Sequence, residues 1–403
     1  MDRTRPFLAV SCAAALICTW SACTSGAADW PQWRGPSRDG ISPEVPAKLF
    51  SNKPLWRRPM MGKCAAGVAV SAGFVVAPDH GDRKDYLRCY TDNGEPVWVH
   101  SYDNTAEMEY TPAPRATPLI ADGLVYALGA AGHLRCLKLD TGALVWQTNI
   151  AEQFAAPLPQ YGYCSSPIIV DGNLIVNPGA KDASVAALDP KTGKVIWQTP
   201  GAAAAYASFI AATFGGTLQI VGYDSESLGG WLPATGKRLW RLVPPTAGDF
   251  NVGTPVDAAG KLLVCTDNNY ARLYGFKDGG TIIEKPLAVN QDLAMDMGTP
   301  TVADGLAFAT GMGLLCMDAG DLKTRWLSND DTSPRGFSKV IAGNGRAMIF
   351  CENGTMLLIA ATGDKPEIIG SIKLTGDTWS HPAIAGGRLY VRDERLLYCY
   401  DLR

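Results

Sequence analysis

The sequence predicts an all-β protein, an eight-bladed β-propeller of four-stranded antiparallel blades that is closed by an N-terminal strand. Three observations lead to this prediction. A phrase of strands and turns recurs along the chain, its period is about 40 to 50 residues, and the runs between its turns are short, apolar and rich in Val, Ile and Leu. With 403 residues, of which 47% are hydrophobic and 43 are Gly, the chain can build a large, turn-rich core.

The recurring phrase begins with a small residue and Pro. It continues through an apolar strand, a Gly turn, a second strand, and a later Asp or Gly turn that is followed by Trp. The clearest copy starts at Thr117-Pro118, turns at Asp122-Gly123, and ends at Gly142 before Trp146. The sequence contains eight such starts, at Ala66-Gly67, Thr117-Pro118, Ser166-Pro167, Ser208-Phe209, Thr254-Pro255, Thr299-Pro300, Ser338-Lys339 and His381-Pro382.

The spacing of these starts distinguishes a propeller from a helical repeat. Pro118 and Pro167 are 49 positions apart, and Pro255 and Pro300 are 45 positions apart. Pro300 and Pro382 are 82 positions apart, which is two units of 41. Units of this length with four strands each are typical of propeller blades. Eight starts therefore predict eight blades.

The two ends of the repeat region indicate how the ring closes. The last copy stops at Leu396–Asp401, which corresponds to a third strand, and no Gly-to-Trp fourth strand follows it. Pro54-Leu55-Trp56, just before the first complete copy, has the character of that missing strand. We therefore expect Leu55-Trp56 to form the outermost strand of the blade that contains Pro382 to Asp401, which leaves no free sheet edge at the seam.

A Gly and a Trp lie four positions apart in four copies, and the fixed offset predicts that each indole packs at the same place between blades. A ring of Trp side chains that binds sugars or a cofactor is the less favoured alternative, because a ligand site has no reason to repeat with the period of the fold. The pairs are Gly94 and Trp98, Gly142 and Trp146, Gly193 and Trp197, and Gly236 and Trp240.

The first residues have the layout of an export signal. Basic residues precede an apolar run, Phe7 to Cys18, which is too short to span a membrane stably, and small residues precede Cys23. Two outcomes stay open. Cys23 is a lipidation candidate, although Trp20 stands where a lipobox usually has Leu, and the alternative is cleavage near Ala27-Ala28, which releases a protein that begins near Asp29.

Three segments follow from these observations: a signal peptide at 1–23, of the lipoprotein type if Cys23 is acylated, an N-terminal extension at 24–53, and the propeller at 54–403. The predicted location is outside the cytoplasm, either periplasmic, outer-membrane-associated or secreted. The formal net charge is −3, and acidic and basic residues are interleaved, so the chain offers no basic surface for nucleic acid. Contact with a membrane is expected only through a lipid anchor.

The repeat copies resemble those of the pyrroloquinoline-quinone (PQQ) type propellers, in which the fourth strand ends in the same Gly-to-Trp phrase, from about Leu55 to Arg403. The segment Asp29–Ile41, which reads DWPQWRGPSRDGI, is similar to the leader of secreted bacterial members of that family. The resemblance implies one of two functions, catalytic or non-catalytic. Some members are PQQ-dependent alcohol or sugar dehydrogenases, and others are non-catalytic, such as the lipoprotein scaffold of the outer-membrane β-barrel assembly machine.

The residues that the resemblance assigns to catalysis are not evident. The dehydrogenases similar to methanol dehydrogenase carry adjacent cysteines over the quinone and carboxylates around calcium, and this sequence contains no Cys-Cys pair. It also lacks the Cys-x-x-Cys-His motif of a covalent heme and the His-Glu-x-x-His motif of a zinc hydrolase. We therefore expect no catalytic residues, no metal and no cofactor. Sugar dehydrogenases can lack the Cys pair, so PQQ with calcium remains the alternative.

Eight cysteines from Cys64 onward are expected to be free thiols. They fall into three sets of equivalent repeat positions, and equivalent positions in different blades lie farther apart than the Cα separation that a disulfide needs, about 4.4–6.8 Å. The sets are Cys64 and Cys164, Cys265 and Cys351, and Cys89, Cys136, Cys316 and Cys399. The run from Asp79 to Asp85 is interpreted as a solvated loop in preference to a metal loop, because its spacing is not that of an EF-hand.

Segments that precede the first strand of each blade converge on the central channel, so their polar and aromatic residues are the default binding candidates. Tyr110 and Asp249 belong to these segments, and the candidates favoured for a ligand site are Arg115, Tyr163, Tyr206, Asn251, Asp296, Arg335, Trp379 and His381.

Two functions remain in view. The favoured one is a binding or scaffold propeller of the cell envelope with protein or peptide partners, and the alternative is a compact PQQ-dependent dehydrogenase.

Overall fold

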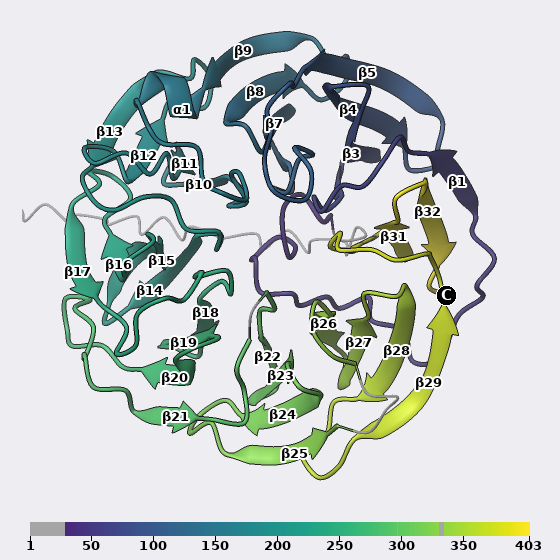
Figure 1. Cartoon of the computed structure of the whole chain (residues 1–403). Helices are drawn as coiled ribbons and strands as arrows, with labels where there is room; N and C mark the ends of the chain where they lie inside the picture. Colours follow the sequence, from purple (N-terminus) through teal and green to yellow (C-terminus); the bar gives the residue numbers. More distant parts are fainter. Residues whose placement is uncertain (1–28, 296, 330–333) are drawn as a thin grey trace, which may run out of the picture.

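The computed structural model of the protein describes residues 29–295, 297–329 and 334–403. Cys23 and Asp296 therefore lie outside the described residues. Thirty-two strands in this part of the chain form eight four-stranded antiparallel sheets around a common axis (Figure 1). The predicted eight-bladed propeller is confirmed.

The first four blades follow one another in chain order, each from its inner to its outer strand. Their strands are β2 (Ala69–Ser71), β3 (Phe74–Gly81), β4 (Lys84–Thr91) and β5 (Pro96–Asp103); β6 (Leu119–Ala121), β7 (Leu124–Leu128), β8 (His133–Lys138) and β9 (Leu144–Asn149); β10 (Ile168–Val170), β11 (Asn173–Val176), β12 (Val185–Leu188) and β13 (Val195–Thr199); and β14 (Ile210–Phe214), β15 (Thr217–Tyr223), β16 (Leu228–Trp231) and β17 (Arg238–Leu242).

The last four blades have the same order, except that the outer strand of blade 8 comes from the start of the chain. Their strands are β18 (Val256–Ala258), β19 (Lys261–Thr266), β20 (Tyr270–Tyr274) and β21 (Ala288–Asn290); β22 (Thr301–Ala303), β23 (Leu306–Thr310), β24 (Leu314–Asp318) and β25 (Thr324–Ser328); β26 (Lys339–Gly343), β27 (Arg346–Phe350), β28 (Thr355–Ala360) and β29 (Glu367–Lys373); and β30 (Ala383–Ala385), β31 (Arg388–Arg392), β32 (Leu396–Asp401) and β1 (Trp56–Pro59).

One short helix, α1 (Ile150–Gln153), interrupts this pattern after blade 2. It starts at Asn149, whose side-chain oxygen accepts a hydrogen bond from the backbone N–H of Ala151 at 2.9 Å, which is the usual way in which Asn caps a helix. The described residues contain no helix long and apolar enough to cross a membrane.

The hydrophobic core lies between the blades and not at the axis. One cluster joins Val76 and Leu87 of blade 1 to Ile120 and Val125 of blade 2, and all four side chains are buried. Middle strands are covered on both faces by neighbouring sheets, so they read as continuous apolar runs, whereas an outer strand such as β5 alternates exposed and half-buried residues.

The predicted closure of the ring is confirmed. Strand β1 pairs antiparallel with β32, with Trp56 opposite Cys399, and the backbone N–H of Leu55 donates to the carbonyl oxygen of Cys399 at 2.7 Å. Blade 8 therefore takes three strands from the C-terminus and its outermost strand from the N-terminus.

The repeated Gly and Trp pack between blades, as predicted. The indole of Trp98 in blade 1 lies so close to Gly142 of blade 2 that a Cβ at Gly142 would stand 2.6 Å from it. The indole N–H of Trp98 also donates to the carbonyl oxygen of Leu139 at 2.8 Å. Trp56 makes the corresponding contacts across the seam, on Gly94 and on the carbonyl oxygen of Asp92 at 2.9 Å.

All eight described cysteines are free thiols, and six of them are buried. Five of them lie in strands and are buried, whereas Cys64, Cys164 and Cys351 lie in the connecting segments.

The interpretation of Asp79 to Asp85 as a solvated loop is wrong for its two ends. The run forms the tip of the β3–β4 hairpin, where Asp82 and Arg83 make the turn with φ of 51° and 59°. Asp79 and Asp85 are buried. Their carboxylates tolerate burial because each has a partner: Arg88 Nε donates to Asp79 at 2.9 Å, and His80 Nδ1 pairs with Asp85 at 2.7 Å. No group of three metal-ligating side chains occurs in the described ranges, this hairpin included.

Hydroxyl groups at the repeat starts connect neighbouring blades around the channel. In five consecutive interfaces the backbone N–H of one start donates to the side-chain oxygen of the next, and we call these five oxygens the hydroxyl belt. The bonds run from Gly67 to Thr117 (3.1 Å), from Thr117 to Ser166 (2.9 Å), from Ser166 to Ser208 (3.0 Å), from Ser208 to Thr254 (3.1 Å) and from Thr254 to Thr299 (3.1 Å). The preference for Ser or Thr at this position therefore has a structural cause.

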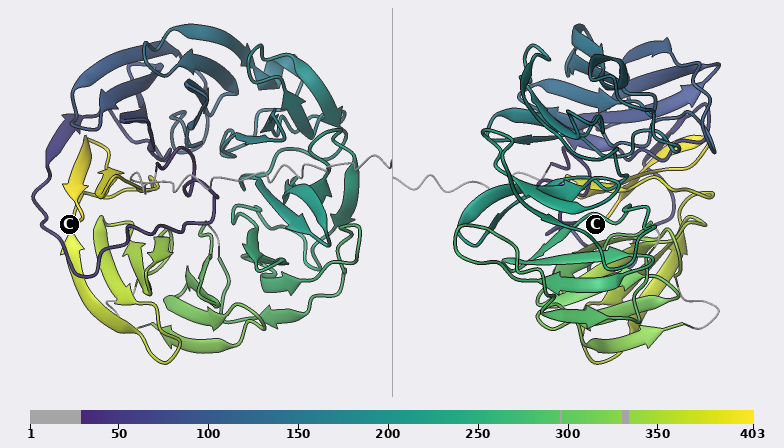
Figure 2. Two further views of the ribbon diagram at one scale, coloured as in Figure 1. Left: turned by 180° about the vertical axis from the view of Figure 1, so that it is seen from behind. Right: turned by 60° about the vertical axis from the view of Figure 1, so that its left-hand side comes forward.

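The extension that precedes β1 crosses the central channel. Residues 30–42, which we call the N-terminal plug, run in front of the blades at the centre of the ring when the molecule is seen from behind (Figure 2, left). Trp30 exchanges two backbone hydrogen bonds with Val70 of blade 1, and Gly40 accepts a backbone hydrogen bond from Ala342 of blade 7. Gly35 turns the segment at φ 84° against the Trp30 ring, where a side chain would be strained.

Two arginines attach the plug to blades 3 and 6. Arg38 donates from Nη1 to the carbonyl oxygen of Pro167 and from Nη2 to that of Ser166, both at 3.0 Å. Arg34 donates from Nη1 to the carbonyl oxygen of Thr299 at 3.0 Å and from Nη2 to that of Pro300 at 2.8 Å. Both arginines thus bind the carbonyl pair of a repeat start, which the sequence alone did not indicate.

Candidate functional site

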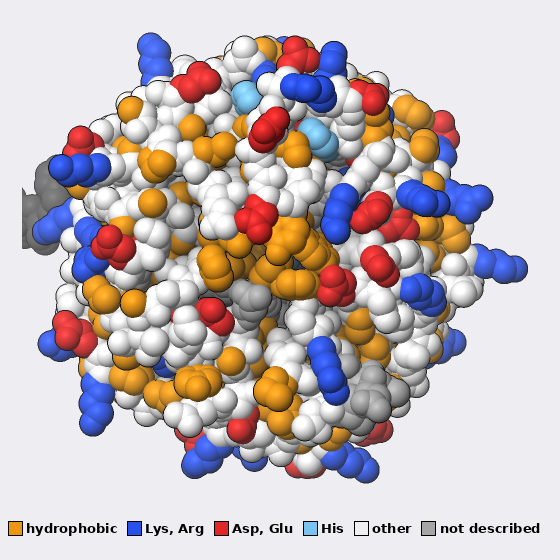
Figure 3. All heavy atoms as spheres, viewed as in Figure 1, with side chains coloured by type: hydrophobic (Ala, Val, Ile, Leu, Met, Phe, Trp, Pro, Cys, Tyr) orange, Lys and Arg blue, Asp and Glu red, His pale blue; other side chains and the backbone are white. Residues whose placement is uncertain are grey.

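A cavity of about 250 Å³ lies at the mouth of the axial channel. Every blade contributes to its wall through the segment before its first strand, and the plug closes it from below with Trp33 and Arg34. Hydrophobic side chains gather around this hollow at the centre of the face (Figure 3). The channel of the propeller is therefore a blind cavity that opens on one face.

Six aromatic side chains form a continuous arc around the mouth. We call Phe337, Trp379, Tyr110, Tyr161, Tyr206 and Phe250 the aromatic arc. Ring centroids are 5.0 to 5.8 Å apart along the row from Phe337 through Trp379 and Tyr110 to Tyr161, and both Tyr206 and Phe250 contact Tyr161, at 5.4 and 5.8 Å. Tyr110 is 68% exposed and Phe250 is 45% exposed. Exposed apolar rings that converge on one hollow are typical of a binding surface.

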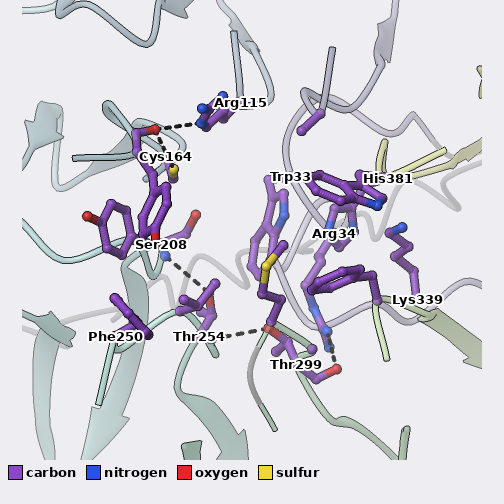
Figure 4. Close-up of a pocket in the computed structure, with 18 of the residues that line it drawn as sticks. Trp33, Arg34, Arg115, Cys164, Ser208, Phe250, Thr254, Thr299, Lys339 and His381 are labelled. Carbon is purple, nitrogen blue, oxygen red and sulfur yellow. Dashed lines mark hydrogen bonds between the residues drawn. The ribbon is translucent and has the colours of Figure 1, made fainter. Parts of the chain in front are cut away.

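The base of the cavity is polar and positively charged, in contrast to the aromatic mouth. Trp33, Arg34, Lys339 and His381, which we call the cationic floor, lie together on one side of it, across from Arg115 and Phe250 (Figure 4). The rings of Trp33 and His381 are in edge contact at 5.4 Å, and the Arg34 guanidinium lies 5.4 Å from the Trp33 ring centroid. Burial lowers the pKa of Arg34 to about 10, so its guanidinium is still charged at neutral pH.

Lys339 and His381 depart from the repeat that positions them. Lys339 stands in blade 7 where five other starts have Pro, and His381 stands in blade 8 where the hydroxyl belt has Ser or Thr. Lys339 Nζ donates to the carbonyl oxygen of Thr378 at 3.3 Å, and no described carboxylate lies within 4.0 Å of it. In blades 7 and 8, therefore, a residue that usually serves the fold is replaced by one that faces the cavity.

Burial changes the charge of both groups. It lowers the pKa of Lys339 from 10.5 to about 7, although Glu352 and Cys351 oppose the shift. It also lowers the pKa of His381 well below its usual value, and the charges of Lys339 and Arg34 lower it further. At neutral pH His381 is a neutral ring with one N–H donor, and Lys339 is partly protonated.

A thiol in the wall has no nucleophilic character. Cys164 lines the cavity, and burial raises the pKa of its thiol to about 12. Since the thiolate is the reactive form, Cys164 is an inert neutral thiol at physiological pH.

Four of the eight predicted site residues line the cavity, namely Arg115, Tyr206, Trp379 and His381. Three others lie elsewhere among the described residues. Tyr163 is buried and its hydroxyl donates to the carbonyl oxygen of Pro178 at 2.9 Å. Asn251 is buried against the backbone of Asp224, and Arg335 is exposed and donates to the carbonyl oxygen of Asn329.

The prediction did not include several residues of the site. Tyr161, Phe250 and Phe337 belong to the same pre-strand segments as the predicted residues and could have been included on position alone. Lys339 had a stronger signal, because it replaces the Pro of the repeat start. Trp33 and Arg34 had none, since nothing in the local sequence shows that the extension returns to the axis.

The described residues of the cavity do not fit a calcium-bound quinone. Calcium binds through six to eight oxygen ligands, mostly carboxylates and carbonyls, and the described lining contains neither Asp nor Glu. The charged groups present are cations, which would repel the metal. No catalytic step through PQQ and calcium can be built from these residues.

A family model described as outer membrane protein assembly factor BamB matches the chain over residues 49–215, 84–326 and 225–403. BamB of Escherichia coli (strain K12) is 31% identical over 87 residues, which is 20% of this chain and 21% of that protein. A 1-butanol dehydrogenase (quinone) of Thauera butanivorans is 26% identical over 227 residues, which is 47% of this chain and 36% of that protein. The matches thus span well under two thirds of either relative.

Solved structures share the fold. BamB from Moraxella catarrhalis superimposes with a TM-score of 0.62 at 15% identity, over 88% of this chain and 100% of that chain. Quinohemoprotein alcohol dehydrogenase from Comamonas testosteroni superimposes with a TM-score of 0.65 at 13% identity, over 93% of this chain and 80% of that chain. Both groups of PQQ-type propellers are therefore similar to this chain.

Proposed function

Since the chain belongs to the family described as outer membrane protein assembly factor BamB, we propose that it is a non-catalytic binding propeller of the cell envelope, and that the axial mouth is its binding face. The expected location is the periplasm or the outer-membrane surface, and the segment 1–23 is the proposed export signal. The expected partners are proteins or peptides of the envelope.

The observation that carries this proposal is the composition of the mouth. The aromatic arc offers exposed rings, and the cationic floor offers donors and positive charge. Calcium binding needs oxygen ligands, mostly carboxylates and carbonyls, and the described lining provides neither Asp nor Glu. Aromatic and Arg side chains at the centre of a hollow are what a binding face uses.

One experiment separates this proposal from the dehydrogenase alternative. The purified mature protein is incubated with PQQ and calcium, separated from free quinone by gel filtration, and assayed for dye-linked oxidation of a panel of alcohols and aldoses. We expect no dye reduction above the background of heat-treated protein. Turnover that is lost in His381→Ala would replace the proposal with a quinoprotein dehydrogenase.

A second experiment tests whether partners use the mouth. A photo-crosslinking amino acid is placed at Tyr110, which is 68% exposed in the aromatic arc, or at Ile368, which is 56% exposed on the outer strand β29. In cells that produce the protein, we expect a discrete protein adduct from position 110 that weakens in Trp379→Ala. Equal adducts from both positions would contradict a binding face at the mouth.

A further inference from the structure

The buried cations of the plug and floor form no ion pair with a described residue, although Asp39 and Glu352 act on Arg34 and Lys339 from beyond ion-pair distance. Arg34, Arg38 and Lys339 are 5%, 4% and 8% exposed, and no described carboxylate lies within 4.0 Å of their nitrogens. Their hydrogen bonds go to backbone carbonyls and to the side chains of Thr301 and Gln32, which are neutral. Buried positive charge without a partner is unfavourable, and an anion in the cavity would offset that cost.

Donors for an anion are present at the floor. Lys339 Nζ uses one of its three donors, on Thr378, and no hydrogen bond connects the ring of His381 to a described residue. Arg34 lies behind them with its Nη groups on backbone carbonyls, and its buried Nε has no partner. Lys339 and His381 would therefore contact the anion, and Arg34 would supply charge from the next layer.

The walls above the floor select the rest of the ligand. The aromatic arc presents ring faces, which favour stacking or edge contacts with another aromatic ring. The described lining contains no Asp, Glu, Asn or Gln, so it lacks the carboxylate and amide oxygens that would accept hydrogen bonds from the many hydroxyls of a sugar. The volume of about 250 Å³ lies just below the roughly 300–1,000 Å³ of pockets for drug-sized ligands, which favours a small molecule.

We propose that the cavity binds a small aromatic carboxylate, with its carboxylate on Lys339 and His381 and its ring against the aromatic arc. The inference rests on the proposed function, since it names the ligand class of the same mouth. Binding is coupled to a proton, because a carboxylate on Lys339 favours the ammonium form. The charged or titratable groups that face Lys339 are Glu352 and Cys351 from blade 7, His381 from blade 8 and Arg34 from the plug.

The test uses the mature protein and 2-naphthoate, with binding followed by calorimetry and by quenching of tryptophan fluorescence. We expect saturable binding of one molecule, and binding of the neutral 2-naphthamide that is at least about tenfold weaker. The affinity for naphthoate should fall by at least about tenfold between pH 6.5 and pH 8.5, because the proton on Lys339 is lost over this range. A short peptide that ends in Trp with a free carboxylate is measured in parallel.

Variants locate the site. Lys339→Met should weaken naphthoate binding at pH 6.5 by at least about tenfold and remove its pH dependence, while Lys285→Met, at an exposed lysine on the rim of blade 5, should leave both unchanged. Tyr110→Ala removes an exposed ring of the arc and should weaken naphthoate and the amide alike.

The outcomes are distinct. If the peptide binds more tightly than naphthoate, the natural ligand is the C-terminal carboxylate of a peptide. If naphthoate binds more tightly, the ligand is a free aromatic acid. Either result supports an aromatic carboxylate as the ligand class. Equal affinity for naphthoate and naphthamide, unchanged binding in Lys339→Met, or no saturable binding at millimolar concentration would overturn the inference. None of these results would alter the turnover and crosslinking measurements that test the proposed function.

Discussion

Replacing Lys339 by Met is expected to stabilise the protein at neutral pH. Met keeps the length and the apolar stem of the side chain and removes only the ammonium group. Burial lowers the pKa of Lys339 from 10.5 to about 7, and each pKa unit corresponds to about 1.4 kcal/mol. The charged lysine therefore costs the folded state about 5 kcal/mol below pH 7, which the substitution removes.

The sign of the pH dependence follows from the two pKa values. Between about pH 7 and 10.5 the unfolded chain holds a proton on Lys339 that the folded chain has released, so raising the pH stabilises the wild-type protein. The advantage of Lys339→Met should then shrink by about 1.4 kcal/mol for each pH unit. Groups that do not interact with Lys339 titrate alike in both proteins, and their effects cancel in the difference.

Urea unfolding followed by tryptophan fluorescence at pH 7.5, 8.5 and 9.5 measures this difference in the free energy of unfolding. Lys285→Met, at an exposed lysine, is the matched control for removing one positive charge. A difference between wild type and Lys339→Met that does not change with pH would refute the reasoning. So would a variant less stable than the wild type at pH 7.5.

Four further predictions follow from the fold. Trp56→Ala should lower the free energy of unfolding by about 2–3 kcal/mol in urea titrations, because it removes the indole that covers Gly94 and its hydrogen bond across the seam, whereas the exposed Leu55→Ala should cost under about 0.5 kcal/mol. Arg38→Ala should cost roughly 1–3 kcal/mol in the same assay, since it leaves two buried carbonyls of blade 3 without a donor. Alkylation under denaturing, non-reducing conditions should add eight adducts from Cys64 onward, and fewer than seven would reveal a disulfide. Incorporation of labelled fatty acid that is lost in Cys23→Ser would establish a lipid anchor, and its absence would favour cleavage near Ala27-Ala28.

The blades could be predicted because their signals are local. A start with Ser or Thr, a Gly turn and a Trp at a fixed offset each reflect a contact that recurs in several blades, as the hydroxyl belt and the Trp98 contact on Gly142 illustrate. Strand β1 could be placed at the seam because the last copy of the repeat lacks its fourth strand. Composition and period therefore sufficed for the architecture.

The site could be predicted only in part, for the opposite reason. Its position at the pre-strand segments follows from the fold, and Arg115, Tyr206, Trp379 and His381 lie there. Whether a side chain in such a segment turns toward the cavity depends on tertiary packing, which buried Tyr163 elsewhere. The contribution of the plug depends on contacts between residues more than 250 positions apart, such as Arg34 and Thr299, and these leave no trace in local sequence.

The route of the plug also sets how the molecule would stand on a surface. Asp29 accepts a hydrogen bond from Ser71, at the end of β2 that points away from the mouth, so the chain enters the described fold beside the rear opening of the ring. Position 23 is six residues before position 29, and even a fully extended chain of that length reaches at most about 20 Å. A lipid on Cys23 would hold the rear opening against the membrane and leave the aromatic arc facing the aqueous space, whereas a chain cleaved after Ala28 would tumble freely with either face available.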